Sequence, residues 1–204
     1  MADLKRTTIP LMLLGDGQIG KTSLALRLTG NKFDDSVLTT IGKESYIYET
    51  IIEGNKLKMK IWDTAGQERF KSMSVGVIKN VEGLILTYSI ANRESFENLN
   101  NWLEQLNNAD DLSKKPIIIV GNKLDLNEFR VVPKEEGEKF AKEHNYKFYE
   151  TSAKTGENVV EAFTDIFDQL YKKFKDEITG TKAVKDKMRL EDSKKKNKEK
   201  NKCC

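Results

Sequence analysis

Residues 15–22 have the composition and spacing of a site for phosphate groups. They read Gly15-Asp16-Gly17-Gln18-Ile19-Gly20-Lys21-Thr22, which fits the phosphate-loop pattern G-x-x-x-x-G-K-[ST]. Its glycines let backbone N–H groups turn toward an anion, and the helix expected to begin at Lys21 adds the positive end of its dipole. The Lys21 ammonium can reach the β- and γ-phosphates of a nucleotide, and the Thr22 hydroxyl can ligate Mg²⁺. Ser23, in the same first turn, completes the predicted nucleotide-binding segment.

A second cluster follows an apolar stretch and reads Ile61-Trp62-Asp63-Thr64-Ala65-Gly66-Gln67-Glu68. Asp63 at the end of a strand can hold Mg²⁺ through water, and Gln67 stands where it could orient a water molecule. A phosphate loop alone is compatible with ATPases, kinases and GTPases. The second cluster narrows the choice among these three classes of enzyme.

The third and fourth clusters indicate which base is bound. Asn122-Lys123-Leu124-Asp125 and Thr151-Ser152-Ala153-Lys154 each follow a predicted strand. The Asp125 carboxylate can accept hydrogen bonds from N1–H and the exocyclic amine of guanine, whereas adenine offers no such donor pair on that edge. Residues 151–154 would complete the pocket from the other side. All four clusters lie at the carboxyl ends of strands, where open α/β sheets bind ligands.

The elements that must hold these clusters form a doubly wound α/β domain, because apolar runs alternate with segments of helical period. We expect a mostly parallel six-stranded sheet with one antiparallel edge strand and flanking helices. The predicted strands are Leu11–Leu14, Ser45–Glu53, Lys56–Trp62, Leu84–Ile90, Ile117–Gly121 and Tyr146–Glu150. Pro10 cannot donate to a ladder, so the first strand should begin at or after it. Gly54-Asn55 is the expected turn of the antiparallel hairpin. The predicted helices are Lys21–Thr29, Arg93–Asn108, Pro133–His144 and Glu157–Phe174.

The chain has 204 residues, 35 Lys+Arg and 32 Asp+Glu, a size that suits one globular domain. Residues 175–204 hold 11 Lys+Arg and 6 Asp+Glu, a net charge of +5, which leaves −2 for residues 1–174. From Ser193 the sequence reads SKKKNKEKNKCC and cannot bury enough surface to become ordered. We therefore expect a nucleotide-binding domain over residues 1–176 and a flexible basic tail over 177–204. The apolar runs are far shorter than the roughly 18–20 residues of a spanning helix, so we expect a cytosolic protein.

Together these motifs resemble the small GTPases of the Ras superfamily. The phosphate loop, Thr40-Ile41-Gly42, Trp62–Phe70, Asn122–Asp125 and Ser152–Lys154 carry the resemblance. The run WDTAGQERF and the terminal Cys203-Cys204 are similar to the Rab family. The resemblance implies that Phe33 stacks on guanine and that Thr40 contacts Mg²⁺ and the γ-phosphate. It also implies that the Gly66 amide meets the γ-phosphate and that Gln67 orients the attacking water.

By the same resemblance the protein would alternate between GDP- and GTP-bound states, hydrolyse GTP slowly and regulate vesicle trafficking. Its expected partners are effectors, an exchange factor, a GTPase-activating protein, a GDP-dissociation inhibitor and a prenylation escort protein. No arginine in the loops is evidently placed as a finger, since Arg69 is expected to make surface contacts. Hydrolysis should then proceed at about 10⁻⁴ to 10⁻³ s⁻¹ without an activator. We expect a monomer that binds no nucleic acid.

The tail implies attachment to a membrane surface. In the Rab family a terminal Cys-Cys implies geranylgeranyl groups on Cys203 and Cys204, behind a spacer rich in lysine. Two lipid chains, or one chain with a polybasic segment, anchor a protein stably. The expected location is the cytoplasmic face of intracellular membranes, with a cytosolic pool.

The sequence departs from the Rab pattern mainly where partners bind. Lys43-Glu44-Ser45 replaces the usual small apolar residue, Asp and Phe, and residues 74–80 read SVGVIKN where a Tyr-Tyr-Arg is common. The aromatic triad presented to effectors becomes Ser45, Trp62 and Val77. Gln18 and Ser89 also replace the usual Gly and Asp. One alternative therefore stays open, a membrane-tethered scaffold that holds nucleotide with little or no hydrolysis. A P-loop kinase or ATPase would leave residues 122–125 and 152–154 unexplained.

Overall fold

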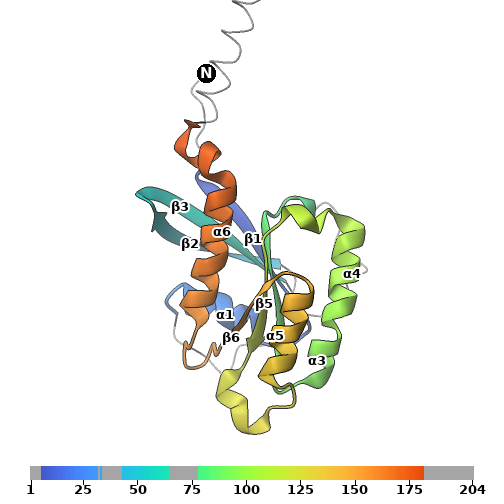
Figure 1. Cartoon of the computed structure of the whole chain (residues 1–204). Helices are drawn as coiled ribbons and strands as arrows, with labels where there is room; N and C mark the ends of the chain where they lie inside the picture. Colours follow the sequence, from blue (N-terminus) through green and yellow to red (C-terminus); the bar gives the residue numbers. More distant parts are fainter. Residues whose placement is uncertain (1–5, 32, 34–42, 65–77, 182–204) are drawn as a thin grey trace, which may run out of the picture.

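The computed structural model describes residues 6–31, 33, 43–64 and 78–181, which contain a six-stranded sheet of order β2-β3-β1-β4-β5-β6 (Figure 1). Strand β2 pairs antiparallel with β3, and the other pairings are parallel. The predicted sheet with one antiparallel edge strand is confirmed. The strands are β1 Thr8–Leu14, β2 Lys43–Ile52, β3 Asn55–Thr64, β4 Gly83–Ser89, β5 Ile117–Asn122 and β6 Lys147–Glu150. The helices are α1 Lys21–Leu28, α3 Arg93–Glu97, α4 Leu99–Ala109, α5 Lys134–Glu143 and α6 Val159–Thr179, with 3₁₀ turns at Leu112–Lys114 and Leu124–Phe129. None of the helices in these ranges is long and apolar enough to cross a membrane.

Helices cover both faces of the sheet, because successive strand residues point to opposite sides. In β1, Leu11 and Leu13 join a core cluster with α1 and α6, while Met12 and Leu14 join a second cluster with α3, α4 and α5. Both sets are fully buried. Since β1 is central and buried on both faces, the core clusters on both sides of the sheet fix the point at which the following loop begins.

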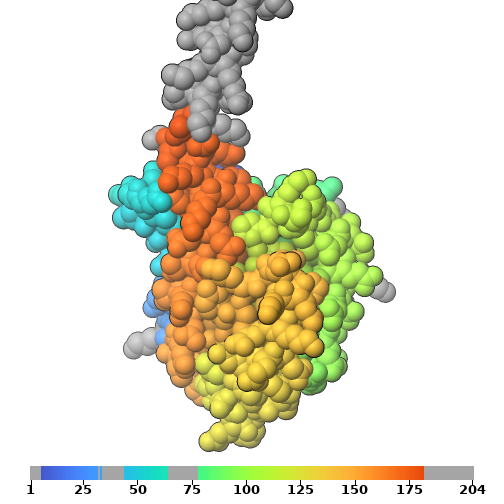
Figure 2. All heavy atoms as spheres, viewed as in Figure 1, coloured from blue at the N-terminus to red at the C-terminus, as the bar shows by residue number. Residues whose placement is uncertain are grey.

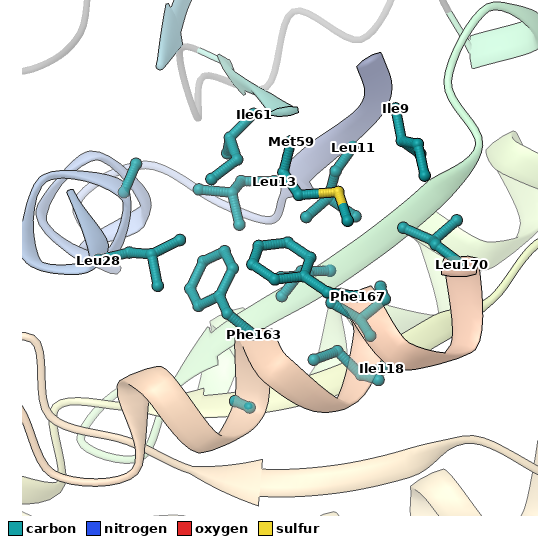
Figure 3. Close-up of a cluster of buried hydrophobic side chains, with 14 of the residues drawn as sticks. Ile9, Leu11, Leu13, Leu28, Met59, Ile61, Ile118, Phe163, Phe167 and Leu170 are labelled. Atoms are coloured by element: carbon teal, nitrogen blue, oxygen red, sulfur yellow. The ribbon is translucent and has the colours of Figure 1, made fainter. Parts of the chain in front are cut away.

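Helix α6 forms one wall of the first cluster. Phe163, Phe167 and Leu170 point from it toward β1, β3 and β5 (Figure 3). The helix predicted over Glu157–Phe174 is present, but it starts at Val159 and continues to Thr179. Ile178, one further turn along, is also buried. The helix ends at Gly180, which has a φ of 77° and supplies the left-handed C-cap.

The first strand begins earlier than predicted, because Pro10 lies within it. The Pro10 carbonyl oxygen accepts a hydrogen bond from the Glu82 amide (2.8 Å). This side of the Pro10 backbone therefore faces β4. The N–H that proline lacks would point to the same side, and the ladder to β4 starts only at Leu11, opposite Gly83. No ladder bond is therefore lost there, and pairing with β3 continues from Thr8.

The β2–β3 hairpin is confirmed, but its turn is Glu53-Gly54 and not Gly54-Asn55. Both turn residues have positive φ, 47° and 77°, as the two-residue turn of a twisted hairpin requires. The tip of the hairpin is fixed to α6, since Asn55 Nδ2 donates to Tyr171 Oη (3.1 Å) and Tyr171 Oη donates to Glu53 Oε2 (3.2 Å). The space-filling view shows the hairpin beside the upper half of α6 (Figure 2).

The single helix predicted over Arg93–Asn108 is wrong, because it is divided at Asn98. Asn98 has φ −68° and ψ −12°, and it separates α3 from α4. Its side-chain amide donates to Asp16 in the phosphate loop (2.8 Å). A sequence periodicity carries no signal for such a long-range contact.

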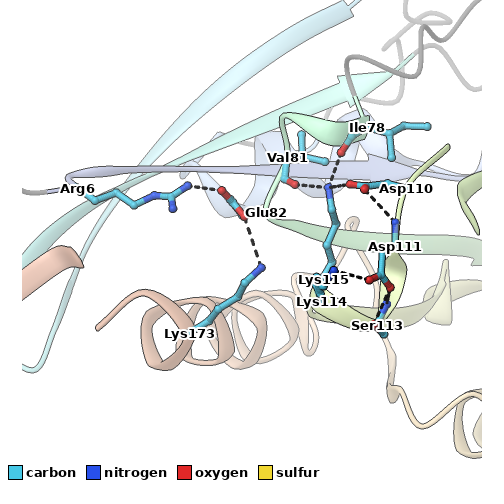
Figure 4. A network of polar contacts seen from close by, with 10 residues as sticks. All are labelled: Arg6, Ile78, Val81, Glu82, Asp110, Asp111, Ser113, Lys114, Lys115 and Lys173. Atoms are coloured by element: carbon cyan, nitrogen blue, oxygen red, sulfur yellow. Dashed lines mark hydrogen bonds and ion pairs between the residues drawn. The ribbon is translucent and has the colours of Figure 1, made fainter. Parts of the chain in front are cut away.

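A buried lysine joins three segments on the α4 side of the sheet. The Lys115 ammonium donates to the carbonyl oxygens of Ile78 (2.6 Å) and Val81 (2.7 Å) and pairs with Asp110 (2.8 Å), as Figure 4 shows. The Lys115 side chain is only 7% exposed. In the same view Glu82 pairs with Arg6 and Lys173, which connects the chain before β4 to the start of β1 and to α6.

Replacing Thr87 with valine should stabilise the protein. The Thr87 hydroxyl is fully buried in β4 and has no hydrogen-bond partner among the described atoms. Since valine has nearly the same shape and no polar atom to desolvate, Thr87→Val should raise the free energy of unfolding by about 1 kcal/mol. Urea denaturation measures this change.

The matched control is Thr151→Val. Thr151 is equally buried, but its hydroxyl donates to Asn122 Oδ1 (3.2 Å). This substitution should lower the free energy of unfolding by about 1 kcal/mol, because it leaves the amide oxygen short of a donor. An equal decrease in the free energy of unfolding for the two valine variants would contradict the prediction that the Thr87 hydroxyl destabilises the fold.

Candidate nucleotide site

The phosphate loop runs from the end of β1 to the start of α1 and depends on close backbone approaches at two glycines. Gly15 has a φ of 130°, and a Cβ there would lie 2.1 Å from the Thr87 carbonyl oxygen. Gly20 has a φ of 92°, and its Cβ would lie 2.6 Å from Asn122 Nδ2. Gln18 is exposed with a φ of 59°, which glycine adopts more readily. The loop therefore accommodates Gln18, in place of the glycine that is usual there, at the cost of some backbone strain.

Lys21 lies folded under this loop. Its ammonium donates to the carbonyl oxygens of Gly15 (2.9 Å) and Asp16 (2.6 Å), and the residue is only 4% exposed. Burial lowers the pKa of Lys21 to about 8, although the negative charges of Asp63 and Asp16 oppose this effect. The loop thus holds a cation whose charged form an added anion would stabilise.

Thr22 and Asp63 meet where β1 and β3 end side by side. The Thr22 hydroxyl donates to Asp63 Oδ2 at 2.6 Å, and Asp63 is fully buried. A hydroxyl and a carboxylate in contact are the hard oxygen donors that Mg²⁺ takes in nucleotide sites. These two residues therefore fit the predicted metal, whose third predicted contact, Thr40, lies outside the described residues.

Asn122, at the end of β5, joins the phosphate loop to residues 151–154, which follow β6 and are called the β6 loop below. Its Nδ2 donates to the Ile19 carbonyl oxygen (2.8 Å), and its Oδ1 accepts from Thr151 Oγ1 (3.2 Å) and the Ala153 amide (3.3 Å). The side chain is buried, so each of these bonds is shielded from water. The predicted base segment and the predicted phosphate segment are therefore linked through hydrogen bonds of Asn122.

The residues expected to contact the base also lie together. Ser152 Oγ donates to Asp125 Oδ1 (2.6 Å) and accepts the Thr155 amide (3.1 Å). Lys123, two residues before Asp125, has a φ of 67°. Burial lowers the pKa of the Lys123 ammonium. Arg27 of α1 donates to the carbonyl oxygens of Ala153 (2.7 Å) and Lys154, which ties the β6 loop to the phosphate-loop helix.

The Asp16 carboxylate is bound at the α3–α4 junction. Asn98 Nδ2 donates to one oxygen and Trp102 Nε1 to the other, each at 2.8 Å. The Asp16 backbone carbonyl, in contrast, accepts the Lys21 ammonium within the loop. Sequence reasoning missed Asn98, Trp102 and Arg27, because helical spacing indicates only the face of a helix and not the loop that it contacts.

Other predicted site residues divide into described and undescribed positions. Phe33 is partly buried and packs against the first core cluster. Gly17 and Ser23 lie in the loop and in α1, both partly exposed. The predicted residues outside the described ranges are Thr40, Gly66, Gln67, Cys203 and Cys204.

Binding of a nucleoside diphosphate should be coupled to proton uptake at Lys21. With a pKa of about 8 in the free protein, most Lys21 is neutral at pH 9, and a bound β-phosphate restores the charged form. Binding should take up about one proton at pH 9 and about 0.1 proton at pH 7. Calorimetry in buffers of different ionisation enthalpy measures the uptake. The nucleoside monophosphate is the control, and equal uptake for the two ligands would refute the assignment to Lys21.

Comparison with known proteins agrees with this geometry. Residues 10–172 match the Ras family. The chain is 37% identical to the Ras-related protein Rab-13 of Mesocricetus auratus over 193 residues, 95% of this chain and 94% of the relative. It is 40% identical to Ras-related protein Rab-8B of Homo sapiens over 172 residues, 81% of this chain and 82% of that protein. The chain therefore belongs to the Ras family and, within it, to the Rab small GTPases.

Proposed function

We propose that this Rab protein binds GDP and GTP in turn, hydrolyses GTP slowly and regulates vesicle trafficking at intracellular membranes. The observation that carries the proposal is the hydrogen-bonded junction at Asn122, which joins the phosphate loop to the Thr151–Lys154 loop. A site that binds phosphate alone has no need of a rigid second loop. A ligand with phosphates at one end and a base at the other needs both loops at a fixed separation.

The phosphate end is held by Lys21 and the backbone of residues 15–20. On nucleotide binding, the Lys21 ammonium exchanges the Gly15 and Asp16 carbonyl oxygens for phosphate oxygens, and the N-terminus of α1 adds its dipole. Thr22 and Asp63 would hold the metal, with Thr40 as the remaining protein contact. Bound Mg²⁺ neutralises charge on the β- and γ-phosphates.

The base end selects guanine. Asp125 accepts hydrogen bonds from the N1–H and the exocyclic amine of the base, and Ser152 Oγ, which donates to Asp125 Oδ1 (2.6 Å), orients the carboxylate. Ala153 and Lys154 border the pocket, and Arg27 fixes their carbonyl oxygens. The apolar part of Lys123 and the Phe33 ring would cover the two faces of the base.

Hydrolysis depends on Gln67 and Thr40, which lie beyond the described ranges. Gln67 orients the attacking water, and the Gly66 amide contacts the γ-phosphate. In the absence of an arginine finger the rate should be on the order of 10⁻⁴ to 10⁻³ s⁻¹, and a GTPase-activating protein would raise it about 10³–10⁵-fold. Loss of the γ-phosphate would release the two loops around residues 34–43 and 65–80, which partners can read.

A loaded-nucleotide assay with Mg²⁺ tests the proposal. The protein should bind GTP and GDP far more tightly than ATP and should hydrolyse bound GTP in a single turnover. Gln67→Leu should slow that turnover by at least about tenfold, because the water loses its orienting group.

Arg69→Ala is the control, since Arg69 is expected to make only surface contacts. A Gln67 variant as fast as the parent would count against the role of Gln67. Tight GTP binding without hydrolysis, even with candidate activators present, would instead favour the nucleotide-bound scaffold.

The partner surface should differ from that of other Rabs. Ser45 and Trp62 are cross-strand neighbours on β2 and β3, and Lys60 lies over the Trp62 ring at 4.2 Å. This part of the expected effector triad thus carries one aromatic side chain beside a cation. We propose that effectors, the exchange factor and the escort protein recognise it through this altered hairpin.

The basic tail should carry prenyl groups on Cys203 and Cys204. Two chains, or one chain with about 1 kcal/mol from each juxtamembrane lysine, would anchor the protein to an anionic cytoplasmic leaflet. Mass spectrometry of the natively expressed C-terminus should find geranylgeranyl groups on both cysteines. A Cys203→Ser, Cys204→Ser variant should stay in the soluble fraction, and unmodified thiols in the native protein would overturn this prediction.

A further inference from the structure

We propose that Asn98 and Trp102 are positioning residues for the phosphates of the nucleotide, acting through the Asp16 carboxylate. The inference rests on the proposed function and adds a requirement to it, that the junction between α3 and α4 sets the shape of the phosphate loop. The observation behind it is a pair of hydrogen bonds, Asn98 Nδ2 and Trp102 Nε1 to the two Asp16 carboxylate oxygens, each 2.8 Å.

Asp16 is held through both its side chain and its backbone. Its carboxylate is bound by the helices, and its backbone carbonyl accepts the Lys21 ammonium (2.6 Å). A residue restrained at both ends fixes the direction of the peptide units on either side of it. The N–H groups of the following glycine-rich segment are therefore aimed before the ligand arrives, and this reduces the ordering cost of binding.

The charge of Asp16 makes this arrangement necessary. A carboxylate in a loop that binds a polyphosphate would repel the ligand and compete with it for the Lys21 ammonium. The two donors occupy both carboxylate oxygens, and they offset the negative charge that Asp16 would otherwise offer to the ligand and to the Lys21 ammonium. The Lys21 ammonium stays directed to the carbonyl side, where the phosphates would bind.

The donors themselves are rigidly supported. Trp102 is 5% exposed and belongs to the second core cluster, together with Leu99, Leu103 and Leu106 of the same helix. Asn98 lies at the point where α3 and α4 divide, and its Oδ1 accepts from Asn101 Nδ2 (3.2 Å). The α4 side of the core thereby reaches the phosphate loop through two side chains.

The test compares GDP with GMP in the full-length protein. Trp102→Phe keeps the ring packing and removes the N–H donor. The affinity for GDP should fall by about tenfold, the usual effect of losing one hydrogen bond to a charged group, and the affinity for GMP should change less than about twofold. The difference between the two ligands isolates the β-phosphate. A role in folding alone would weaken both ligands equally, and that result would overturn the proposal.

Three comparisons make the result specific. Leu106→Val loosens α4 at a fully buried position that forms no bond to Asp16, and it should leave the GDP/GMP ratio unchanged. Asn98→Ala removes the second donor and should lower the ratio as Trp102→Phe does. In an Asp16→Ala background Trp102→Phe should have no further effect on the ratio, and a persisting effect would show that Trp102 does not act through Asp16.

The parent protein is measured first. If it binds neither GDP nor GTP, the proposed function fails and this inference with it. If it binds GDP tightly and the ratio is insensitive to Trp102 and Asn98, only the positioning role fails.

Discussion

One buried amide side chain constrains the whole nucleotide site. Asn122 contacts the phosphate loop through Ile19 and the β6 loop through Thr151 and Ala153, and it is 1% exposed. A buried polar group left without a partner costs about 1–3 kcal/mol, so the two loops cannot separate without losing that energy. Because parallel strands deliver their following loops to one edge of the sheet, a single residue there can set the distance between them.

The phosphate half of the site is organised around the Lys21 ammonium and the Thr22–Asp63 contact. Lys21 is buried among carbonyl oxygens with a lowered pKa, and the Thr22 hydroxyl already contacts Asp63. The one carboxylate within the loop, Asp16, is bound on the helix side. The Lys21 ammonium thus donates to the loop's own carbonyl oxygens, while the Asp16 carboxylate is held by Asn98 and by Trp102 of the second core cluster.

One departure from the Rab pattern, Lys43-Glu44-Ser45, falls on the β2–β3 hairpin. Ser45 and Trp62 pair across the β2–β3 hairpin, whose tip is tied to α6 by Tyr171 and by a Lys175–Glu53 ion pair (2.7 Å). Changes in the outward side chains of this hairpin alter the surface offered to partners. The strand pairing and the core packing that support the nucleotide site are unaffected, since they depend on the inward residues.

The sequence by itself determined the sheet, the phosphate loop, the guanine motif and the family, because each depends on local spacing: apolar alternation, glycines before Lys21, and Asn122 through Asp125. It ended the last helix at Phe174, whereas α6 continues to Thr179 because Ile178 is buried one turn further along. Tertiary structure alone decided the break at Asn98, the tolerance of Pro10 within β1 and the contacts of Asp16 with Trp102 and of Arg27 with the β6 loop. These features join residues far apart in the chain, and only the packed sheet and helices bring their donors and acceptors within bonding distance.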